Sequence, residues 1–352
     1  MERLSVVGKS TPRVDALEKV TGKAKYGVDV ELPRMLHAKV LRSRYPHAKI
    51  LSIDTSKAEK LPGVMAVITA EDTLKERVET TWRGRADKYP VALDKVRYVG
   101  EEIAAVAAED ELTAEEALKL IKVEYEELPA IFEPEESMKP GAPKIHNDVE
   151  YNIVHKVDVE YGDVEKGFKE ADYIFEDRFA TAYIHMCQLE LTVCIADFDS
   201  SGKLTFWENS SDPFMYRRLV AKALGITPSN IRIRQNYIGG NFGHYQTELG
   251  HYVITALLAK KAGRPVRLVN TREEEQRLAA QHKEWKLTES LLRLTNNARF
   301  MHVMPFDRGN EVDDSVADGP NSIVYDQAEN LLHVRKSFLA SLMVDSSSLE
   351  SI

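Results

Sequence analysis

A glycine-rich stretch, residues 238–246, constrains the fold of this chain more than any other part of its sequence. It contains three glycines and follows a β-rich run over residues 230–237. A run with helical period comes after it, with apolar positions on one face at Leu249, Tyr252, Val253, Ala256 and Leu257. The pattern predicts a glycine-rich loop that connects a strand to a helix.

Such a loop lets the backbone approach a ligand closely, because glycine has no side chain and adopts backbone angles that other residues avoid. Free N–H groups in the loop and at the start of the helix suit a phosphate or an oxo group. A tight turn into a buried helix gives the same pattern. The glycines alone therefore leave both interpretations open.

Composition and charge exclude several classes of protein. With 43% hydrophobic and 29% charged residues, the 352-residue chain is typical of a soluble globular protein with room for two domains. Its net charge of −9 argues against nucleic acid as a partner, since phosphate binding needs a basic face. No run approaches the roughly 20 apolar residues of a membrane span, and residues 1–9 lack the apolar core of a signal peptide. We therefore expect a cytoplasmic protein without membrane contact.

The two cysteines, Cys187 and Cys194, are too few for a disulfide framework. They also exclude an iron–sulfur cluster held by this chain alone, which takes about four thiolates. We expect both to be small residues packed in or beside a strand.

The first part of the chain, residues 13–132, is expected to form an α+β domain. Apolar or alternating runs predict strands over residues 36–41, 48–53, 64–69, 103–108 and 121–126. Helices are expected over residues 55–60 and from Glu111 onward, the second with Thr113 as its N-cap. Residues 76–92 are interpreted as a polar surface loop.

Residues 133–150 have the proline, glycine and acid content of a linker, and a second domain is expected from residue 151. Its predicted strands cover residues 173–179, 193–198 and 204–207, with a hairpin turn over 199–202. A helix over residues 214–224 is expected to end at Gly225.

Three loops at strand ends carry the candidate functional residues: residues 184–190, residues 207–214 and the glycine loop. His185 is either a metal ligand or a hydrogen-bonded histidine, but no second ligand lies at a suitable spacing. Glu190 is either a general base or a structural carboxylate.

Several motifs resemble one enzyme family. Residues 7–26, 110–115 and 142–147, together with the three loops, are similar to the xanthine dehydrogenase/aldehyde oxidase family, and the similarity extends over about residues 6–275. The resemblance implies an α+β chain: an a/b-hammerhead domain over residues 13–132, the linker over 133–150, and a truncated molybdopterin-binding domain over 151–275.

The resemblance also implies a molybdopterin-type molybdenum cofactor, which no side chain of this chain would ligate directly. The cofactor-facing residues would be Gly239, Gly240, Phe242, Gly243 and Ser211. Phe242 would pack near the oxo ligand of the metal, while Gln246, where the family contacts a purine, and Glu190 are the candidates for substrate contact. The chain departs from the family at Ser211, usually glutamine, at Asn241, usually glycine, and at Tyr245, usually lysine.

The family implies further partners. Iron–sulfur clusters and FAD are expected on separate subunits, and the substrate is expected to be a small heterocycle such as a purine. The catalytic glutamate of the family lies in a region to which this chain has no counterpart, so the catalytic residue is unknown.

The last part of the chain, residues 276–352, resembles the C-terminus of an ornithine- or putrescine-type carbamoyltransferase. The similarity rests on the His-x-x-Pro motif of residues 302–305 and on residues 318–330. Leu331 replaces a usual arginine, and the phosphate loop of that family is absent. We expect an α/β tail without carbamoyl transfer.

The sequence thus favours a chimeric, truncated large subunit of a molybdenum hydroxylase that acts in purine catabolism and is weak or inactive alone. A non-catalytic remnant or subunit-contact module is the first alternative. A carbamoyltransferase fragment is the second.

Overall fold

The computed structural model describes residues 10, 13–79, 86–153, 156–159, 161–176, 188–209, 212–242, 249–270 and 312–323, together with residues 289, 293 and 299. Its internal contacts divide the chain into two compact units. The first contains residues 1–155 and 188–271, and the second contains residues 156–187 and 272–352.

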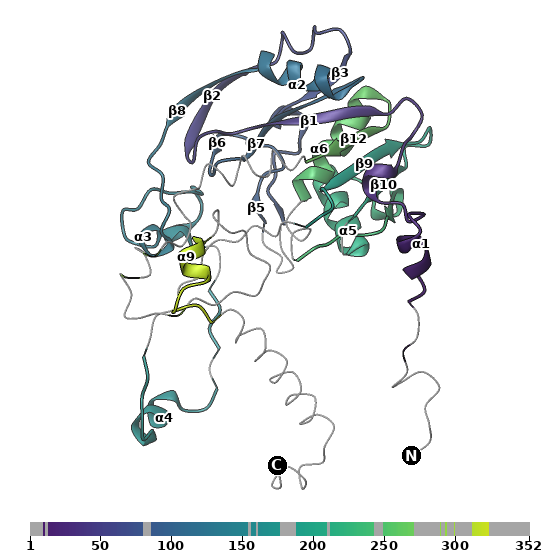
Figure 1. The fold of residues 1–352 in the computed structure, drawn as a ribbon. Coiled ribbons are helices and arrows are strands. Elements are labelled where there is room, and N and C mark those ends of the chain that lie inside the picture. The colour runs from purple at the N-terminus through teal and green to yellow at the C-terminus, as the bar shows by residue number, and fades with distance from the viewer. Residues whose placement is uncertain are drawn as a thin grey trace. The chain divides into compact units, whose positions relative to one another are not determined.

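A seven-stranded sheet organises the first unit (Figure 1). Its strands, in spatial order, are β11 (Ile231–Gln235), β10 (Leu204–Glu208), β9 (Val193–Phe198), β12 (Val266–Val269), β1 (Leu36–Arg42), β7 (Glu102–Ala108) and β3 (Val64–Ile68). β1 and β12 pair in parallel, with Leu36 opposite Val266. Strands from both predicted domains therefore share one sheet, although the boundary between those domains stays a prediction.

A second, three-stranded sheet has the order β6 (Lys95–Val96), β2 (Ala48–Asp54) and β8 (Lys122–Glu127). In β8 the half-buried Val123 and Tyr125 alternate with exposed residues, which confirms the expected strand with one wet face. The prediction of a surface loop over residues 76–92 was wrong. The short strands β4 (Val78–Glu79) and β5 (Ala86–Lys88) pair there, and Val91 is buried.

The principal helices are α2 (Glu111–Leu120), α5 (Pro213–Leu224) and α6 (Leu249–Ala262). α5 ends at Gly225, as expected, with φ +65°. The predicted cap of α2 was wrong, because Asp110 is the N-cap and accepts a hydrogen bond from the backbone N–H of Thr113 at 2.8 Å. The helix predicted over residues 55–60 is a series of turns.

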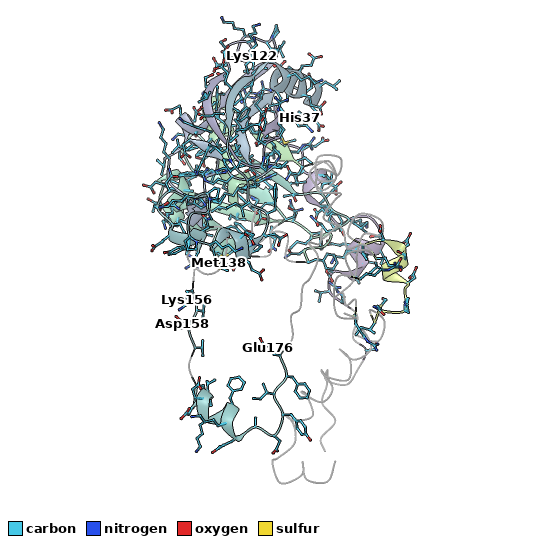
Figure 2. The ribbon with its side chains drawn as sticks, turned by 90° about the vertical axis from the view of Figure 1, so that its left-hand side faces the viewer. His37, Lys122, Met138, Lys156, Asp158 and Glu176 are labelled. Atoms are coloured by element: carbon cyan, nitrogen blue, oxygen red, sulfur yellow. The ribbon has the colours of Figure 1, made fainter. Side chains whose placement is uncertain are left out.

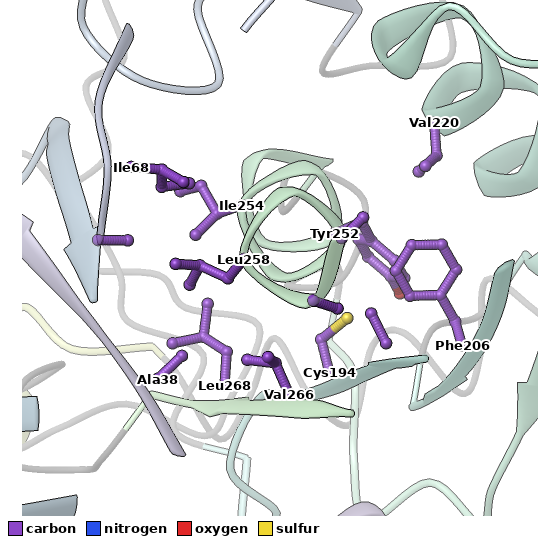
Figure 3. Packing of buried hydrophobic residues seen from close by; sticks show 14 of the residues in the cluster. Ala38, Ile68, Cys194, Phe206, Val220, Tyr252, Ile254, Leu258, Val266 and Leu268 are labelled. Carbon is purple, nitrogen blue, oxygen red and sulfur yellow. The ribbon is translucent and has the colours of Figure 1, made fainter. Parts of the chain in front are cut away.

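Helix α6 lies at the centre of the core rather than on its surface (Figure 3). Ile254 and Leu258 lie on the side towards Ile68. On another side the ring of Tyr252 stacks on Tyr216, with 4.9 Å between centroids. Since nearly every position from residue 249 to 259 is buried, the expectation of one apolar face was too narrow.

The remaining elements are short. In the first unit these are α1 (Ala16–Val20), η1 (Gly27–Asp29), η2 (Ala70–Asp72), α3 (Pro134–Ser137), η3 (Glu150–Asn152) and η4 (Pro228–Asn230). The second unit has α4 (Val164–Glu170) and α9 (Asp314–Ala317). Before α4, Lys156 and Asp158 form an exposed ion pair at 3.1 Å (Figure 2). The strand predicted over residues 173–179 does not form in its described part, residues 173–176.

No helix in the described part of the chain has the length and apolar character that crossing a membrane requires.

Candidate functional site

The glycine loop leaves the end of β11 and packs at once against the segment that precedes β9. The backbone N–H of Gly239 donates to Oε2 of Glu190 at 2.6 Å, and the N–H of Glu190 donates back to the carbonyl of Gly239 at 3.4 Å. Residues 190 and 239 are thus joined by a pair of hydrogen bonds in opposite directions.

Both leading glycines are required by this packing. A Cβ at residue 239 would lie 2.6 Å from the Cβ of Glu190, and one at residue 240 would lie 2.9 Å from the Cβ of Gln188. Gly240 also has a φ of +123°, which disfavours any side chain. The two glycines therefore serve, in part, to let the loop pack closely against Gln188 and Glu190 of the same chain.

Phe242 occupies an unusual backbone position just beyond these glycines. Its φ is +47°, in the left-handed region that bulky residues rarely adopt, and its side chain is 64% exposed. Strained backbone with an exposed aromatic ring is typical of a binding site rather than of a structural turn. The described part of the loop ends at this residue.

A third segment, which our sequence analysis did not find, also meets Glu190. The backbone N–H of Gly27, at the start of η1, donates to Oε1 of Glu190 at 3.2 Å. Glu190 is only 8% exposed, and both its oxygens accept backbone N–H groups. This geometry favours the structural carboxylate over the general base, whereas contact between Glu190 and a substrate stays a prediction.

The same N-terminal segment also contacts Tyr237, which lies just before the glycine loop. The N–H of Tyr237 donates to the carbonyl of Lys25 at 3.2 Å, and its hydroxyl donates to the carboxylate of Glu18. The rings of Tyr26 and Tyr237 lie 6.1 Å apart. The signal for this contact in the sequence was Gly27, which we did not single out.

The described part of the second predicted loop contacts residues that flank both of the others. The side-chain amide of Asn209 donates to the carbonyl of Leu191 at 2.9 Å and accepts from the N–H of Val193 at 3.5 Å. The carbonyl of Glu208 accepts the N–H of Asn236 at 2.9 Å, just before the glycine loop. The described parts of the first loop and the glycine loop therefore meet directly, whereas the second loop contacts residues that flank them.

Behind the loops lie two buried groups that cannot readily ionise. Burial raises the pKa of the Cys194 thiol above its usual range, and burial together with Glu208 raises that of the Tyr252 hydroxyl. The Tyr252 hydroxyl donates to Glu208 at 2.7 Å. Cys194 is a small buried residue of β9, as expected. Among the described side chains, no group of three or more His, Cys, Asp and Glu is placed to hold a metal ion.

Several predicted residues lie outside the described part of the chain: Ser211, Gly243, Tyr245, Gln246, His185 and Cys187. Of the predicted site residues, the structure brings together Glu190, Gly239 and Gly240, with Phe242 at the loop's exposed end. Their roles towards cofactor and substrate stay predictions.

Three protein families match parts of this chain. Residues 21–129 match the a/b hammerhead domain of aldehyde oxidase and xanthine dehydrogenase, and residues 145–291 match a molybdopterin cofactor-binding domain. Residues 264–342 match the Asp/Orn-binding domain of aspartate/ornithine carbamoyltransferases. The last two matches overlap over residues 264–291, which include the predicted junction near residue 276.

Two similar proteins are a probable xanthine dehydrogenase subunit of Bacillus subtilis and the nicotinate dehydrogenase large molybdopterin subunit of Eubacterium barkeri. The first is 39% identical over 79% of this chain and 37% of its own length. The second is 38% identical over 76% of this chain and 62% of its own length. The chain thus spans less than two thirds of each.

Two solved structures share the fold. Quinoline 2-oxidoreductase from Pseudomonas putida 86 superimposes with a TM-score of 0.68 and 30% identity, covering 76% of this chain and 35% of its own. A reconstituted CO dehydrogenase from Oligotropha carboxidovorans gives 0.69 and 33%, with the same two coverages.

Proposed function

We infer the function of this chain from its family, because residues 21–291 belong to the aldehyde oxidase and xanthine dehydrogenase family of molybdenum enzymes. We propose that the chain is the part of a molybdenum hydroxylase large subunit that holds the molybdopterin cofactor beside a small heterocyclic substrate. A purine is the substrate class that the sequence favours.

The glycine loop carries this proposal, and its described residues fit such a group. Gly239 is held from behind by Glu190, and Gly240 turns the chain so that Phe242 is exposed at φ +47°. An aromatic ring held outwards on a fixed loop suits packing against a bulky ligand. Phe242 and the N–H groups of the loop would hold the cofactor, with Gly243 and Ser211 as further predicted contacts.

When bound, the cofactor supplies the oxidising centre that hydroxylates the heterocycle with oxygen from water. Gln246 would orient the substrate by hydrogen bonding to a ring nitrogen or oxygen, since its amide both donates and accepts. The electrons would leave through iron–sulfur and FAD subunits. The proposal assigns no general base to this chain, and weak or absent turnover by the chain alone is part of it.

The test is the molybdenum and pterin content per chain after co-expression with iron–sulfur and FAD subunits. We expect near-stoichiometric molybdenum in the wild-type chain. Gly240→Val is the matched control, since its Cβ would meet Gln188 at 2.9 Å and displace the loop. A wild-type chain with no more molybdenum than this variant would overturn the proposal in favour of a non-catalytic remnant or subunit-contact module.

Ser211 offers a second test of the same loop. Because the family usually has glutamine at this position, Ser211→Gln is expected to increase cofactor retention, with Ser210→Gln as the neighbouring control. Equal molybdenum content in both variants and the wild type would remove Ser211 from the site.

The match of residues 264–342 keeps a carbamoyltransferase fragment as a second candidate. It predicts binding of carbamoyl phosphate to the full chain, measurable by calorimetry. We expect none, because the phosphate loop of that family is absent from the sequence.

A further inference from the structure

Glu190 joins two segments that are far apart in the sequence. Its carboxylate accepts the N–H of Gly27 at 3.2 Å on one oxygen and that of Gly239 at 2.6 Å on the other. We propose that Glu190 is a positioning residue that fixes the glycine loop to the N-terminal segment, residues 18–29. We call this pair of contacts, from Gly27 and Gly239 to Glu190, the clamp. Its expected effect on cofactor binding rests on the proposed function, but the existence of the clamp does not.

The chemistry of the clamp requires a carboxylate. An ionised carboxylate is acceptor-only and offers lone pairs on two oxygens, so it can serve two N–H donors at once. A glutamine of the same length has one acceptor and one donor, and its NH2 group would face a backbone N–H. Hydrogen bonds to a charged acceptor are also stronger than those between neutral groups. Burial of Glu190 to 8% exposure limits competition from water.

The N-terminal segment is seated closely enough to transmit this restraint. Gly27 is buried, and a Cβ there would lie 2.9 Å from the Cβ of Val193 in β9. Ala24 is 6% exposed. The carbonyl of Lys25 accepts the N–H of Tyr237, two residues before Gly239.

The loop is therefore held at two points near its start, at Tyr237 and at Gly239. One contact is the reciprocal pair of bonds between Glu190 and Gly239, and the other is the N-terminal segment against Tyr237. Both act upstream of Phe242, so they set the direction in which the exposed part of the loop leaves the sheet. Without the clamp, Gly239 would lose the hydrogen bonds to Glu190 that orient the residues after it.

Amide exchange of the full chain, labelled with 15N-glycine, tests the clamp directly. The chain has 18 glycines, and the Gly27 and Gly239 signals can be assigned by substitution. In Glu190→Gln we expect exchange at one or both amides to rise by about tenfold or more, the scale of a lost hydrogen bond to a charged group. Glu31→Gln removes an exposed carboxylate from the following segment and should change neither.

Gly250, buried in α6, serves as an internal reference. Unchanged exchange at Gly27 and Gly239 would overturn the clamp. An equal rise at Gly250 would show that Glu190 serves the stability of the whole unit, which would also overturn a positioning role. Gly27→Ala, which displaces the other end of the clamp from Val193, should reproduce the rise at Gly239 with Gly250 unchanged.

Cofactor content separates the clamp from the proposed function. If the co-expressed wild type holds molybdenum, Glu190→Gln and Gly27→Ala should each hold severalfold less, while Glu31→Gln matches the wild type. Equal content despite faster exchange would overturn the link between clamp and cofactor. If the wild type holds none, the proposed function fails, and the exchange data alone decide whether the clamp exists.

Discussion

At the scale of single residues, buried carboxylates dominate the chemistry of the first unit. Among the described residues, four glutamates are less than a tenth exposed, namely Glu101, Glu102, Glu190 and Glu208. Most have close partners: Glu102 pairs with Arg42 at 2.9 Å and Lys88 at 3.1 Å, while Glu208 accepts the hydroxyl of Tyr252. Because a buried charge is costly unless it is paired, each of these partners is a condition for the fold.

Glu101 is deeply buried beside Arg97, whose guanidinium lies 3.5 Å from one carboxylate oxygen and whose backbone N–H donates to the other. Burial raises its pKa from 4.5 to about 7. A raised carboxyl pKa means that the folded state binds the proton more tightly than the unfolded state. The contribution of Glu101 to the unfolding free energy should therefore fall as pH rises from about 4.5 to about 7, by at most about 3 kcal/mol.

Glu101→Gln should remove this pH dependence, because an amide does not titrate, while its oxygen can still accept the N–H of Arg97. Urea unfolding of the variant between pH 4.5 and 8 is the measurement, with the exposed Glu133→Gln as the control. A slope that is the same in Glu101→Gln and the wild type would contradict the assignment.

His47 produces the opposite trend. Its ring is buried, Nδ1 donates to the carbonyl of Pro129 at 2.7 Å, and burial lowers its pKa below 6.5. The unfolded state binds the proton more readily, so the contribution of His47 to stability should fall as pH drops below about 6.5. In His47→Gln this acid loss should shrink by a measurable fraction. His37, a half-buried residue of β1 that lies 3.5 Å from Glu111, supplies the control variant His37→Gln.

At the scale of elements, the sequence predicted most strands and helices but misjudged their surroundings. For α6 the spacing of apolar residues indicated one buried face, which did not include His251 and Thr255. Both are buried instead, and the hydroxyl of Thr255 donates to the carbonyl of His251 at 2.6 Å. A polar residue that is satisfied within its own helix carries no sequence signal of its burial.

The central place of α6 gives a prediction for its core contacts. Leu258 is fully buried, so Leu258→Ala should lower the unfolding free energy by about 2–5 kcal/mol. Leu257 is next to it on the same helix but only partly buried, and Leu257→Ala should cost clearly less. Denaturant unfolding of both variants provides the comparison, and equal losses would contradict the assignment of faces.

The cap of α2 is a second case in which local sequence allowed two interpretations. Thr113 fits a capping box with Glu116, yet Asp110 is the residue that accepts the N–H of Thr113. Asp110→Ala should therefore cost about 1 kcal/mol of stability. Thr113→Ala keeps that backbone bond and should cost less. A larger loss for Thr113→Ala would restore the first interpretation.

At the scale of the whole first unit, the pairing of strands that are far apart in the chain could not be predicted from local sequence patterns. The strand predicted over residues 36–41 forms as β1, but β12 at residues 266–269 was not predicted, and nothing local indicates that the two pair in parallel. In the candidate site, too, locally recognisable residues were predicted and a long-range contact was missed. The glycine loop and Glu190 were predicted from sequence, whereas Gly27 was missed because its role exists only through a contact 163 residues away.

This pairing gives the last prediction. The predicted hammerhead domain, residues 13–132, contains β1, β3 and β7 but neither β12, which pairs with β1, nor α6, which packs on β3 and β7. A fragment of these residues would leave one edge of β1 unpaired and would expose core residues such as Leu36 and Ile68. We expect it to aggregate or to unfold at lower denaturant concentration than a fragment of residues 13–270. A monomeric fragment 13–132 as stable as the longer one would mean that the hammerhead domain is an independent folding unit, and that the shared sheet only joins two domains that are already stable.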